Sequence, residues 1–223
     1  MRVIAGKFKG LRLEAPSADA AHVMGERERG AIFNALFSLG GFEGARVLDV
    51  FAGSGALGLE AVSRGAASVE FVENNPKTRE IIKNNISAIL PTPARSTTSL
   101  GHEGASAPLG AATASPIHPA VPSGSVEPRG LDINPRSTLG ESNSRGAEQQ
   151  YEIIFSDAPY DKPQWGLVAE LPGRLASGGK LVISHAKTTP IPDELVADFA
   201  SLGLEKVYEK TFAAAEIEIF RKK

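Results

Sequence analysis

The chain has 223 residues, 42% of them hydrophobic and 22% charged, and it carries a formal net charge of −2 at pH 7. That length suits one α/β domain with a sizeable core. The chain contains no cysteine, which excludes a disulfide-stapled protein. No stretch reaches the ~18 apolar residues of a membrane helix, and lysines interrupt the apolar residues at the start, so we expect no membrane span, no signal peptide and a cytoplasmic location.

Residues 1–16 predict a β-hairpin that turns around residues 7–10. Four basic residues precede the first acid of the chain, and they are Arg2, Lys7, Lys9 and Arg12. A basic hairpin suits the phosphates of a nucleic acid, but many solvated hairpins of proteins that bind no nucleic acid have the same composition. The four residues are therefore candidates for RNA binding.

A helix is predicted over residues 26–38, and two glycines follow it and end it. Its apolar face comprises Ile32, Ala35, Leu36 and Leu39. Arg27 and Arg29 lie near its start, where they can either bind a phosphate or pair with the neighbouring glutamates. Both arginines join the candidate RNA-binding residues.

The string VLDVFAGSGALGLEA, residues 47–61, is the most informative segment. Its apolar start predicts a buried strand, and residues 56–63 predict a helix that packs back against that strand. Between them Gly53, Gly55 and Gly58 match the pattern G-x-G-x-x-G, which lets backbone amides approach a ligand that a Cβ would keep away. This arrangement predicts a nucleotide-like ligand, while glycines that only permit tight packing are the plainer alternative.

Two acids change the ligand that we expect. Asp49 lies in the strand before the glycine loop, and Glu73 closes the next strand, SVEFVE. In a doubly wound sheet both flank the crevice at the switch point. The sulfonium, amino group and ribose hydroxyls of S-adenosylmethionine suit such carboxylates, whereas a pyrophosphate prefers fewer negative charges. The candidate cofactor-binding residues are Asp49, Phe51, Ala52, Gly53, Ser54, Gly55, Glu73 and Asn74.

Residues 76–90 predict a helix, after which regular patterning ends. Residues 91–150 contain eight of the fifteen prolines and no Phe, Trp or Tyr. Such a composition buries too little apolar surface to offset the entropy of ordering, so we expect a disordered insertion. A short third strand is expected near residues 94–99 or after Leu131, and Asp132 is the only aspartate in the insertion.

The string YEIIFSDAPYDKP, residues 151–163, supplies a second candidate site. Its apolar start predicts a buried strand, and Asp157-Ala158-Pro159-Tyr160 leaves the carboxyl end, where active sites of open α/β sheets lie. The remaining patterns predict a helix at 164–176, a strand at 180–184, a helix at 192–202 and an antiparallel pair at 204–210 and 215–221. Together these elements predict a mostly parallel α/β sheet.

On these residues the chain resembles class I methyltransferases with the amino-methylating motif [DN]-P-P-[YF], and specifically the RsmD family of guanine-N2 methyltransferases of 16S ribosomal RNA. Residues 4–13, IAGKFKGLRL, are similar to the opening of that family, and its arginine helix is matched by Arg27, Arg29, Ile32, Phe33 and Asn34. Three departures are Ala158 for the first proline of the loop, Val23-Met24 for P-T before the helix, and Gly30 for a glutamate.

The resemblance implies a Rossmann-like class I methyltransferase fold, with a doubly wound, mostly parallel seven-stranded sheet and a C-terminal antiparallel hairpin. Residues 1–40 would be a candidate RNA-binding extension that starts with the β-hairpin, and residues 41–223 the methyltransferase domain. The implied partner is 16S ribosomal RNA or a small-subunit assembly particle, and the implied state is a monomer.

The implied reaction moves a methyl group from S-adenosylmethionine to the exocyclic N2 of a guanine. Asp157 and the Ala158 carbonyl would accept hydrogen bonds from the amine, Pro159 would hold the turn and Tyr160 would stack on the base. Phe33 and Asn34 are expected to be structural. Trp165 and His185 either line the cleft or only pack.

Other functions stay open at this point. A DNA or RNA adenine-N6 methyltransferase uses the same loop chemistry, and a catalytically impaired RNA-binding relative has the same sequence pattern. A nicotinamide-dependent dehydrogenase matches the glycine motif but leaves residues 157–160 unexplained. Methylation of pyrimidine C5 is excluded because it needs a cysteine nucleophile. Four scattered histidines without cysteine predict no metal site.

Overall fold

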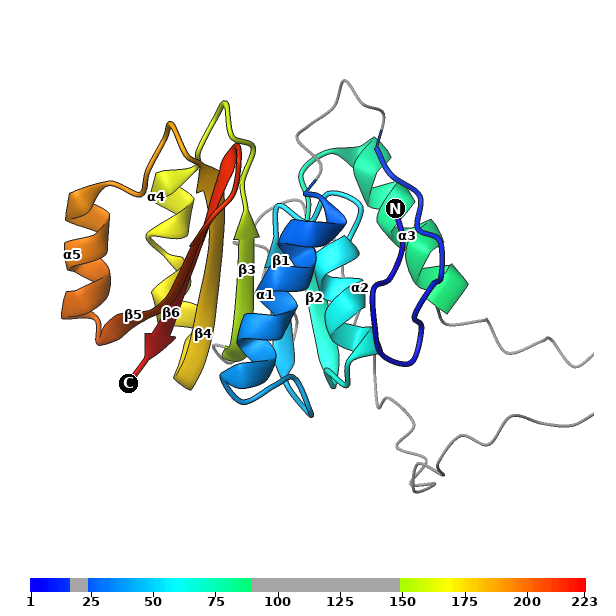
Figure 1. Ribbon diagram of the computed structural model, residues 1–223, viewed down its shortest axis with the longest axis horizontal. Helices are drawn as coiled ribbons and strands as arrows, with labels where there is room; N and C mark the ends of the chain where they lie inside the picture. Colours follow the sequence, from blue (N-terminus) through cyan, green and yellow to red (C-terminus); the bar gives the residue numbers. More distant parts are fainter. Residues whose placement is uncertain (17–23, 90–148) are drawn as a thin grey trace, which may run out of the picture.

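A computed structural model describes residues 1–16, 24–89 and 149–223 (Figure 1). Its centre is a six-stranded sheet in the order β2-β1-β3-β4-β6-β5. The first four strands in the chain run parallel, and β6 pairs antiparallel with both of its neighbours. The strands are β1 (Arg46–Val50), β2 (Ser68–Val72), β3 (Tyr151–Asp157), β4 (Leu175–Ala186), β5 (Leu204–Thr211) and β6 (Ala215–Lys222).

This architecture confirms the predicted α/β class and the closing antiparallel hairpin. The expected seventh strand is not among the described residues, because both segments proposed for it, 94–99 and the one after Leu131, lie outside them. The predicted disordered insertion, residues 91–150, falls outside the described residues up to residue 148, and so does Asp132. No helix in the described ranges is long and apolar enough to cross a bilayer.

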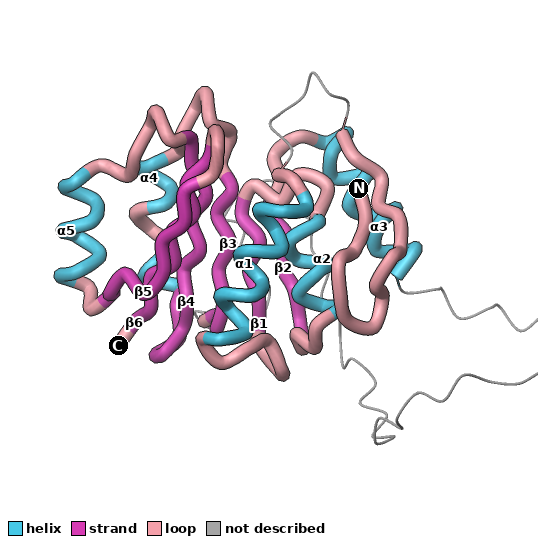
Figure 2. Tube along the Cα trace, in the orientation of Figure 1, coloured by secondary structure: helices cyan, strands magenta, loops and turns pink. Residues whose placement is uncertain are grey.

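Helices cover both faces of the sheet, as Figures 1 and 2 show. The buried residues of α1, α2 and α3 join one apolar cluster, and those of α4 and α5 join a second cluster on the opposite face. The helices are α1 (Glu26–Ser38), α2 (Ala56–Ser63), α3 (Pro76–Ile89), α4 (Trp165–Val168), the 3-10 helix η1 (Leu171–Arg174) and α5 (Asp193–Ser201). A sheet covered on both faces explains the continuous apolar runs in its strands.

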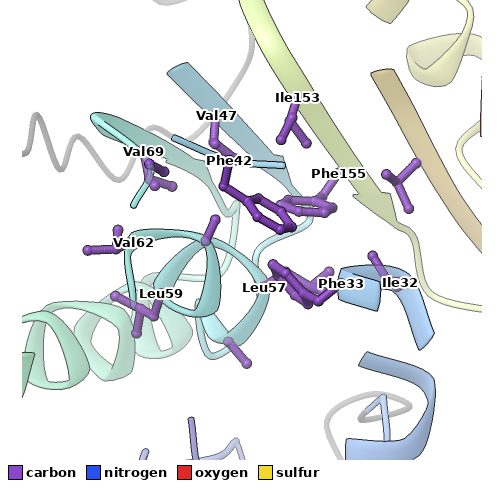
Figure 3. Packing of buried hydrophobic residues seen from close by; sticks show 14 of the residues in the cluster. Ile32, Phe33, Phe42, Val47, Leu57, Leu59, Val62, Val69, Ile153 and Phe155 are labelled. Atoms are coloured by element: carbon purple, nitrogen blue, oxygen red, sulfur yellow. The ribbon is translucent and has the colours of Figure 1, made fainter. Parts of the chain in front are cut away.

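Phe33 of α1 anchors the first cluster (Figure 3). Its ring centroid lies 5.1 Å from that of Phe42 and 5.7 Å from that of Phe155 in β3. Phe33 is fully buried, and burial of such a side chain contributes ~2 to 3 kcal/mol to folding. The expected structural role of Phe33 is confirmed, and the contact fixes α1 over the carboxyl half of β3.

The prediction of one helix over residues 164–176 is wrong. The chain forms the single turn α4 and then η1, and β4 begins already at Leu175. Pro172 lacks a backbone N–H and Gly173 disfavours helix, so an α-helix cannot continue through them. The glycines at 178 and 179 lie within β4, where the pairing with β3 shifts register between Tyr151 and Ile153.

The opening segment folds back on itself with its turn at residues 7–10, as predicted, but its arms form only one antiparallel bridge, Arg2 to Arg12, framed by the Val3 and Leu13 amides, which donate to the carbonyl oxygens of Leu11 and Met1 at 3.0 Å. The amides of Ile4 and Ala5 donate to the Glu60 carboxylate of α2 at 2.6 and 3.0 Å. These donors point at α2 and not at a second arm, which is why ladder pairing stops after one bridge. The loop is therefore docked on the helix that follows the glycine motif.

Candidate active site at the switch point of the sheet

The glycine loop connects the carboxyl end of β1 to α2. Phe51, Gly53 and Gly55 have φ angles of 61°, 56° and 77°, and Phe51 is the only non-glycine with positive φ among the described residues. Such backbone strain in a non-glycine residue is typical of functional sites. A Cβ on Gly58 would lie 2.4 Å from the Phe71 ring, so the third glycine permits close packing of α2 on β2.

Asp49 lies below this loop and not at its surface. The residue is 1% exposed, and its Oδ2 accepts a hydrogen bond of 2.9 Å from the amide of Gly58. Burial raises the pKa of Asp49 well above its usual range, against the Gly58 hydrogen bond, and the charges of Asp157 and Glu73 raise it further. We conclude that Asp49 ties the start of α2 to β1 and shapes the crevice from beneath.

Glu73 follows β2 and reaches back to the glycine loop. Its Oε2 accepts a hydrogen bond of 3.0 Å from the Gly53 amide, and its Oε1 accepts one of 2.8 Å from the Asn75 amide. The carboxylate is half-buried, whereas Asn74 beside it is exposed. The structure thus brings the two halves of the predicted cofactor set, the loop and the acid, into direct contact.

Two supporting residues were missed at the sequence level. Arg79 donates to the carbonyl oxygens of Glu73 and Asn74 at 3.0 and 2.8 Å, and Asn85 donates to the carbonyl oxygen of Ser54 at 2.9 Å. Both residues lie on α3, and their hydrogen-bond acceptors precede that helix in the sequence. An arginine in the first turn after a strand-ending acid was the available signal for Arg79; Asn85 had none.

The second candidate site lies where β3 and β4 end. Asp157 and Ser184 are register partners on these neighbouring strands, and the Ser184 Oγ lies 2.9 Å from the Tyr160 hydroxyl. The Oδ1 atom of Asp157 is enclosed and has no hydrogen-bond partner among the described residues. An acceptor in this condition suits a donor brought by a ligand.

Electrostatics single out the same carboxyl. Burial raises the pKa of Asp157 to about 7, a hydrogen bond from Ser184 opposes the rise, and the charge of Glu28 on α1 adds to it. Burial also raises the pKa of Tyr160 to about 12, with Asp157 as a further cause. Perturbed titration in a crevice is a recognised mark of active sites.

Behind the loop, a pocket is lined by Tyr160, Trp165 and His185 among others. The Trp165 and His185 rings meet edge to face with centroids 6.0 Å apart. His185 Nδ1 lies 3.0 Å from the Ala186 carbonyl oxygen and Nε2 lies 3.4 Å from Glu218 Oε1. Burial lowers the pKa of His185, but the hydrogen bonds to Glu218 and Ala186 raise it more, so the pKa lies above its usual value. His185 is therefore buried and paired with Glu218 of β6, and it also lines this pocket.

The comparisons agree with this geometry. Residues 1–106 match the family described as Conserved hypothetical protein 95. That match covers slightly less than half of the chain. The YlbH protein of Bacillus subtilis is 38% identical over 89 residues, which are 40% of this chain and 47% of that protein. The ribosomal RNA small subunit methyltransferase D of Escherichia coli K12 is 39% identical over 85 residues, 38% of this chain and 42% of that protein. The match thus spans about half the length of these curated relatives.

Solved structures extend the likeness to the whole fold. A hypothetical protein of Thermus thermophilus superposes with a TM-score of 0.63 at 22% identity, over 98% of either chain. The magnesium protoporphyrin IX methyltransferase of Synechocystis PCC 6803 has a TM-score of 0.58 at 11% identity, over 88% of this chain and 79% of that one. The fold is that of class I methyltransferases, so the predicted fold class is confirmed.

The basic residues that the sequence analysis singled out divide by exposure. Lys7, Lys9, Arg12 and Arg27 are exposed, and Arg2 is exposed but paired with Glu26 at 3.1 Å. Arg29 is 2% exposed and donates to the carbonyl oxygens of Met24 and Arg2 at 3.2 and 3.0 Å. The prediction that Arg29 binds RNA is therefore wrong for this structure, because its guanidinium fastens the opening loop to α1.

Proposed function

We propose that this chain transfers a methyl group from S-adenosylmethionine to the exocyclic N2 of a guanine in 16S ribosomal RNA. The observation that carries the proposal is the enclosed, unpartnered Oδ1 of Asp157 at the switch point, next to the glycine loop. The curated relative named ribosomal RNA small subunit methyltransferase D supports the substrate class. The curated relatives match only part of this chain, and the proposed activity is that of the whole chain.

The chemistry of the acceptor site suits an exocyclic amine. The lone pair of guanine N2 is delocalised into the ring, which makes the nitrogen a poor nucleophile. Acceptors that bind its N–H groups, the Asp157 carboxylate and the Ala158 carbonyl, favour a pyramidal nitrogen with its lone pair turned toward the methyl donor. Asp157 takes up the released proton, directly or through water. Pro159 holds the turn, since its carbonyl oxygen accepts a hydrogen bond of 3.0 Å from the Lys162 amide.

The crevice residues fit S-adenosylmethionine, which supplies an electrophilic methyl group when bound. Glu73 offers carboxylate oxygens as acceptors, as a ribose diol requires, and its present partners are the amides of Gly53 and Asn75. The left-handed backbone at Gly53 and Gly55 opens the loop for the methionine part, with Phe51, Ala52 and Ser54 in the same turn. Asn74, exposed after Glu73, is assigned to the adenine.

The proposed RNA-binding surface comprises the exposed basic side chains of the opening loop and of α1, namely Lys7, Lys9, Arg12 and Arg27. Charges of this kind bind phosphates without reading sequence, so base choice belongs to the acceptor site. The target base has to leave its stack to reach Asp157, and Tyr160 then stacks on it. The substrate form is free 16S RNA or a small-subunit assembly particle, and the enzyme acts as a monomer.

The test is methylation of purified small-subunit particles and of naked 16S RNA with a labelled methyl donor, followed by nucleoside mass mapping. We expect N2-methylguanosine at one site. N6-methyladenosine instead would assign the same loop to an adenine substrate. Cofactor binding without any methylated product would identify a catalytically impaired RNA-binding relative, and the proposed function would be wrong.

A further inference from the structure

Asn85 of α3 lies where the opening loop, residues 1–16, meets the glycine loop. Its side chain is 2% exposed. Its Oδ1 accepts a hydrogen bond of 2.7 Å from the Glu14 amide, and its Nδ2 donates to the carbonyl oxygens of Glu14 and Ser54 at 3.1 and 2.9 Å. Both protons and the oxygen of the side-chain amide are thus engaged, and every partner is a backbone atom. One buried side chain therefore joins the backbones of two loops that lie far apart in the sequence.

The other arm of the opening loop reaches the same residue of the glycine loop. The Ser54 hydroxyl donates to the Met1 sulfur at 3.3 Å, and Ser54 itself is 5% exposed. Sulfur is a weak acceptor, so this contact adds less than the amide bonds of Asn85. Ser54 lies between Gly53 and Gly55. The middle of the glycine loop is thus held from both arms of the opening loop.

The opening loop is itself fixed along α2. The Lys7 amide donates to the Ser63 carbonyl oxygen at 2.7 Å, and the Phe8 amide donates to the Ser63 hydroxyl at 2.9 Å. A Cβ on Gly6, whose φ is 83°, would lie 1.9 Å from the Ser63 carbonyl oxygen, so a side chain does not fit there. Ser63 ends α2 and the glycine loop precedes that helix, so the opening loop is fastened at both ends of it, beside α2 and α3 in Figure 1.

The glycine loop needs such support from outside. Phe51, Gly53 and Gly55 have left-handed backbone conformations. Glycine loses more conformational freedom on ordering than any other residue, and a non-glycine residue at positive φ is strained. A loop that is ordered before its ligand arrives does not lose this freedom on binding, which raises affinity. The bond from Asn85 to Ser54 is therefore placed to order the loop in advance.

We propose that Asn85 is a positioning residue for the cofactor, because it ties the glycine loop to the opening loop and so holds it in the shape that binds S-adenosylmethionine. The opening loop is then part of the cofactor site, in addition to carrying proposed RNA-binding residues. The inference rests on the proposed function for the identity of the ligand. Coupling between two sites is reciprocal, so cofactor binding and docking of the opening loop stabilise each other.

The first experiment compares Asn85→Asp with Asn84→Asp in the full chain, by titration calorimetry with S-adenosylmethionine. Asn85→Asp keeps the size of the side chain and the acceptor for the Glu14 amide, but an ionised carboxylate cannot donate to Ser54. Asn84 is the matched control, because it is the exposed neighbour on α3 and its hydrogen bond of 3.2 Å goes to the Glu14 carboxylate. We expect the affinity to fall about tenfold in Asn85→Asp, the equivalent of one lost hydrogen bond, and to be unchanged in Asn84→Asp.

Two further measurements separate positioning from mere stabilisation. A side chain that only stabilised the fold would lower the free energy of unfolding in urea and leave the affinity of the folded protein unchanged. In methyl-transfer assays, the KM for S-adenosylmethionine should rise in Asn85→Asp by the same factor as the dissociation constant. The kcat at saturating cofactor should stay at the wild-type value, because Asn85 acts on the cofactor loop and not on the acceptor site.

Hydrogen exchange in the wild-type protein tests the coupling without a substitution. Saturating S-adenosylmethionine should slow exchange of the Glu14 amide at least about fivefold, the lower end of ordinary coupling between sites. The Gly44 amide is the control, because it donates to the Gly65 carbonyl oxygen at 3.0 Å at the amino ends of β1 and β2, away from the crevice. The slowing at Glu14 should be absent in Asn85→Asp.

Equal affinities for S-adenosylmethionine in the wild type and in folded Asn85→Asp, or an equal loss in Asn84→Asp, overturn the inference. If Asn85→Asp does not fold, unchanged exchange of the wild-type Glu14 amide, or the same slowing at Gly44, overturns it instead. If the affinity falls in Asn85→Asp but no RNA is methylated by the wild type, the proposed function fails and the role of Asn85 stands. Wild-type protein that binds no S-adenosylmethionine overturns both.

Discussion

The two halves of the crevice are built differently. On the β1–β2 side, the polar groups form hydrogen bonds with one another. The Glu73 carboxylate accepts from the amides of Gly53 and Asn75, and the Asn85 side chain donates to the Ser54 carbonyl oxygen. On the β3–β4 side, Asp157 Oδ1 and Ser156 Oγ are enclosed without partners in the described ranges. The cofactor half is thus complete in itself, whereas the acceptor half carries an unsatisfied buried acceptor, which costs about 1 to 3 kcal/mol.

The difference indicates where the molecule gives up stability for function. Backbone amides can hold a glycine loop in shape before a ligand arrives. An acceptor for a substrate N–H has to remain without a partner until the substrate binds. Active sites commonly retain such unfavourable groups, and neutralising them stabilises the fold at the expense of activity.

The largest expected effect is loss of catalysis in Asp157→Ala. Removing the acceptor should lower the methyl-transfer rate by at least ~100-fold, the range for one preorganised electrostatic group. Binding of S-adenosylmethionine should be unchanged, because Asp157 belongs to the acceptor half. Single-turnover assays and calorimetry measure the two quantities, with Asp161→Ala, exposed on the same loop, as the control. Wild-type turnover in Asp157→Ala would end the catalytic assignment.

On the cofactor side, Glu73→Ala should weaken S-adenosylmethionine binding by roughly 1.5 to 3 kcal/mol, as for lost hydrogen bonds to a charged group. Titration calorimetry measures this affinity directly. Glu80→Ala is the matched control, because Glu80 is an exposed glutamate of α3 that pairs with Lys83. Equal affinities for the wild type and Glu73→Ala would remove Glu73 from the site.

Asp157→Asn tests the stability cost of the acceptor half. The Asp157 pKa is about 7 in the folded protein against a usual 3.8, so the native state holds its proton longer than the unfolded state. The contribution of Asp157 to the free energy of unfolding should therefore fall as pH rises from about 4 to 7 and stay level above that. The asparagine variant lacks this loss, and its advantage should grow across the same window to on the order of 4 kcal/mol.

Urea unfolding at pH 5 and pH 8 measures that advantage. A difference between wild type and Asp157→Asn that is identical at both pH values would show that the Asp157 carboxyl is not the source of the cost.

The smallest effect is expected from the arginines of α1. Arg27→Ala should lower the slope of log affinity for RNA against log salt by about 1 without changing the melting temperature, because Arg27 is exposed. Arg29→Ala should instead lower the melting temperature, since its hydrogen bonds to Met24 and Arg2 are lost. Filter binding over a salt series and thermal unfolding separate the pair. A reversal of the two phenotypes would contradict the division by exposure.

Much of the framework was readable from local patterns. The predicted helix at 26–38 coincides with α1, the one at 56–63 coincides with α2, and the predicted start of α3 at Pro76 is confirmed. In each case the signal is local. It depends only on residues close in the sequence, whether it is an apolar repeat every 3.6 residues, a glycine turn or a proline at the first helical position. The contact of Glu73 with the glycine loop followed from the parallel order of β1 and β2.

What the sequence did not reveal depends on partners distant in the chain. Arg27 and Arg29 look alike in the helical pattern of the sequence. Only Arg29 is covered by the opening loop and is therefore structural, whereas Arg27 stays exposed. Ser184 became a partner of Asp157 through the register of β3 and β4, strands joined by two short helices whose bounds were mispredicted. Residue types and spacings therefore determined the fold class, the glycine loop and the acids of the crevice, whereas burial and strand register, which are collective properties of the packed sheet, decided which side chains meet there.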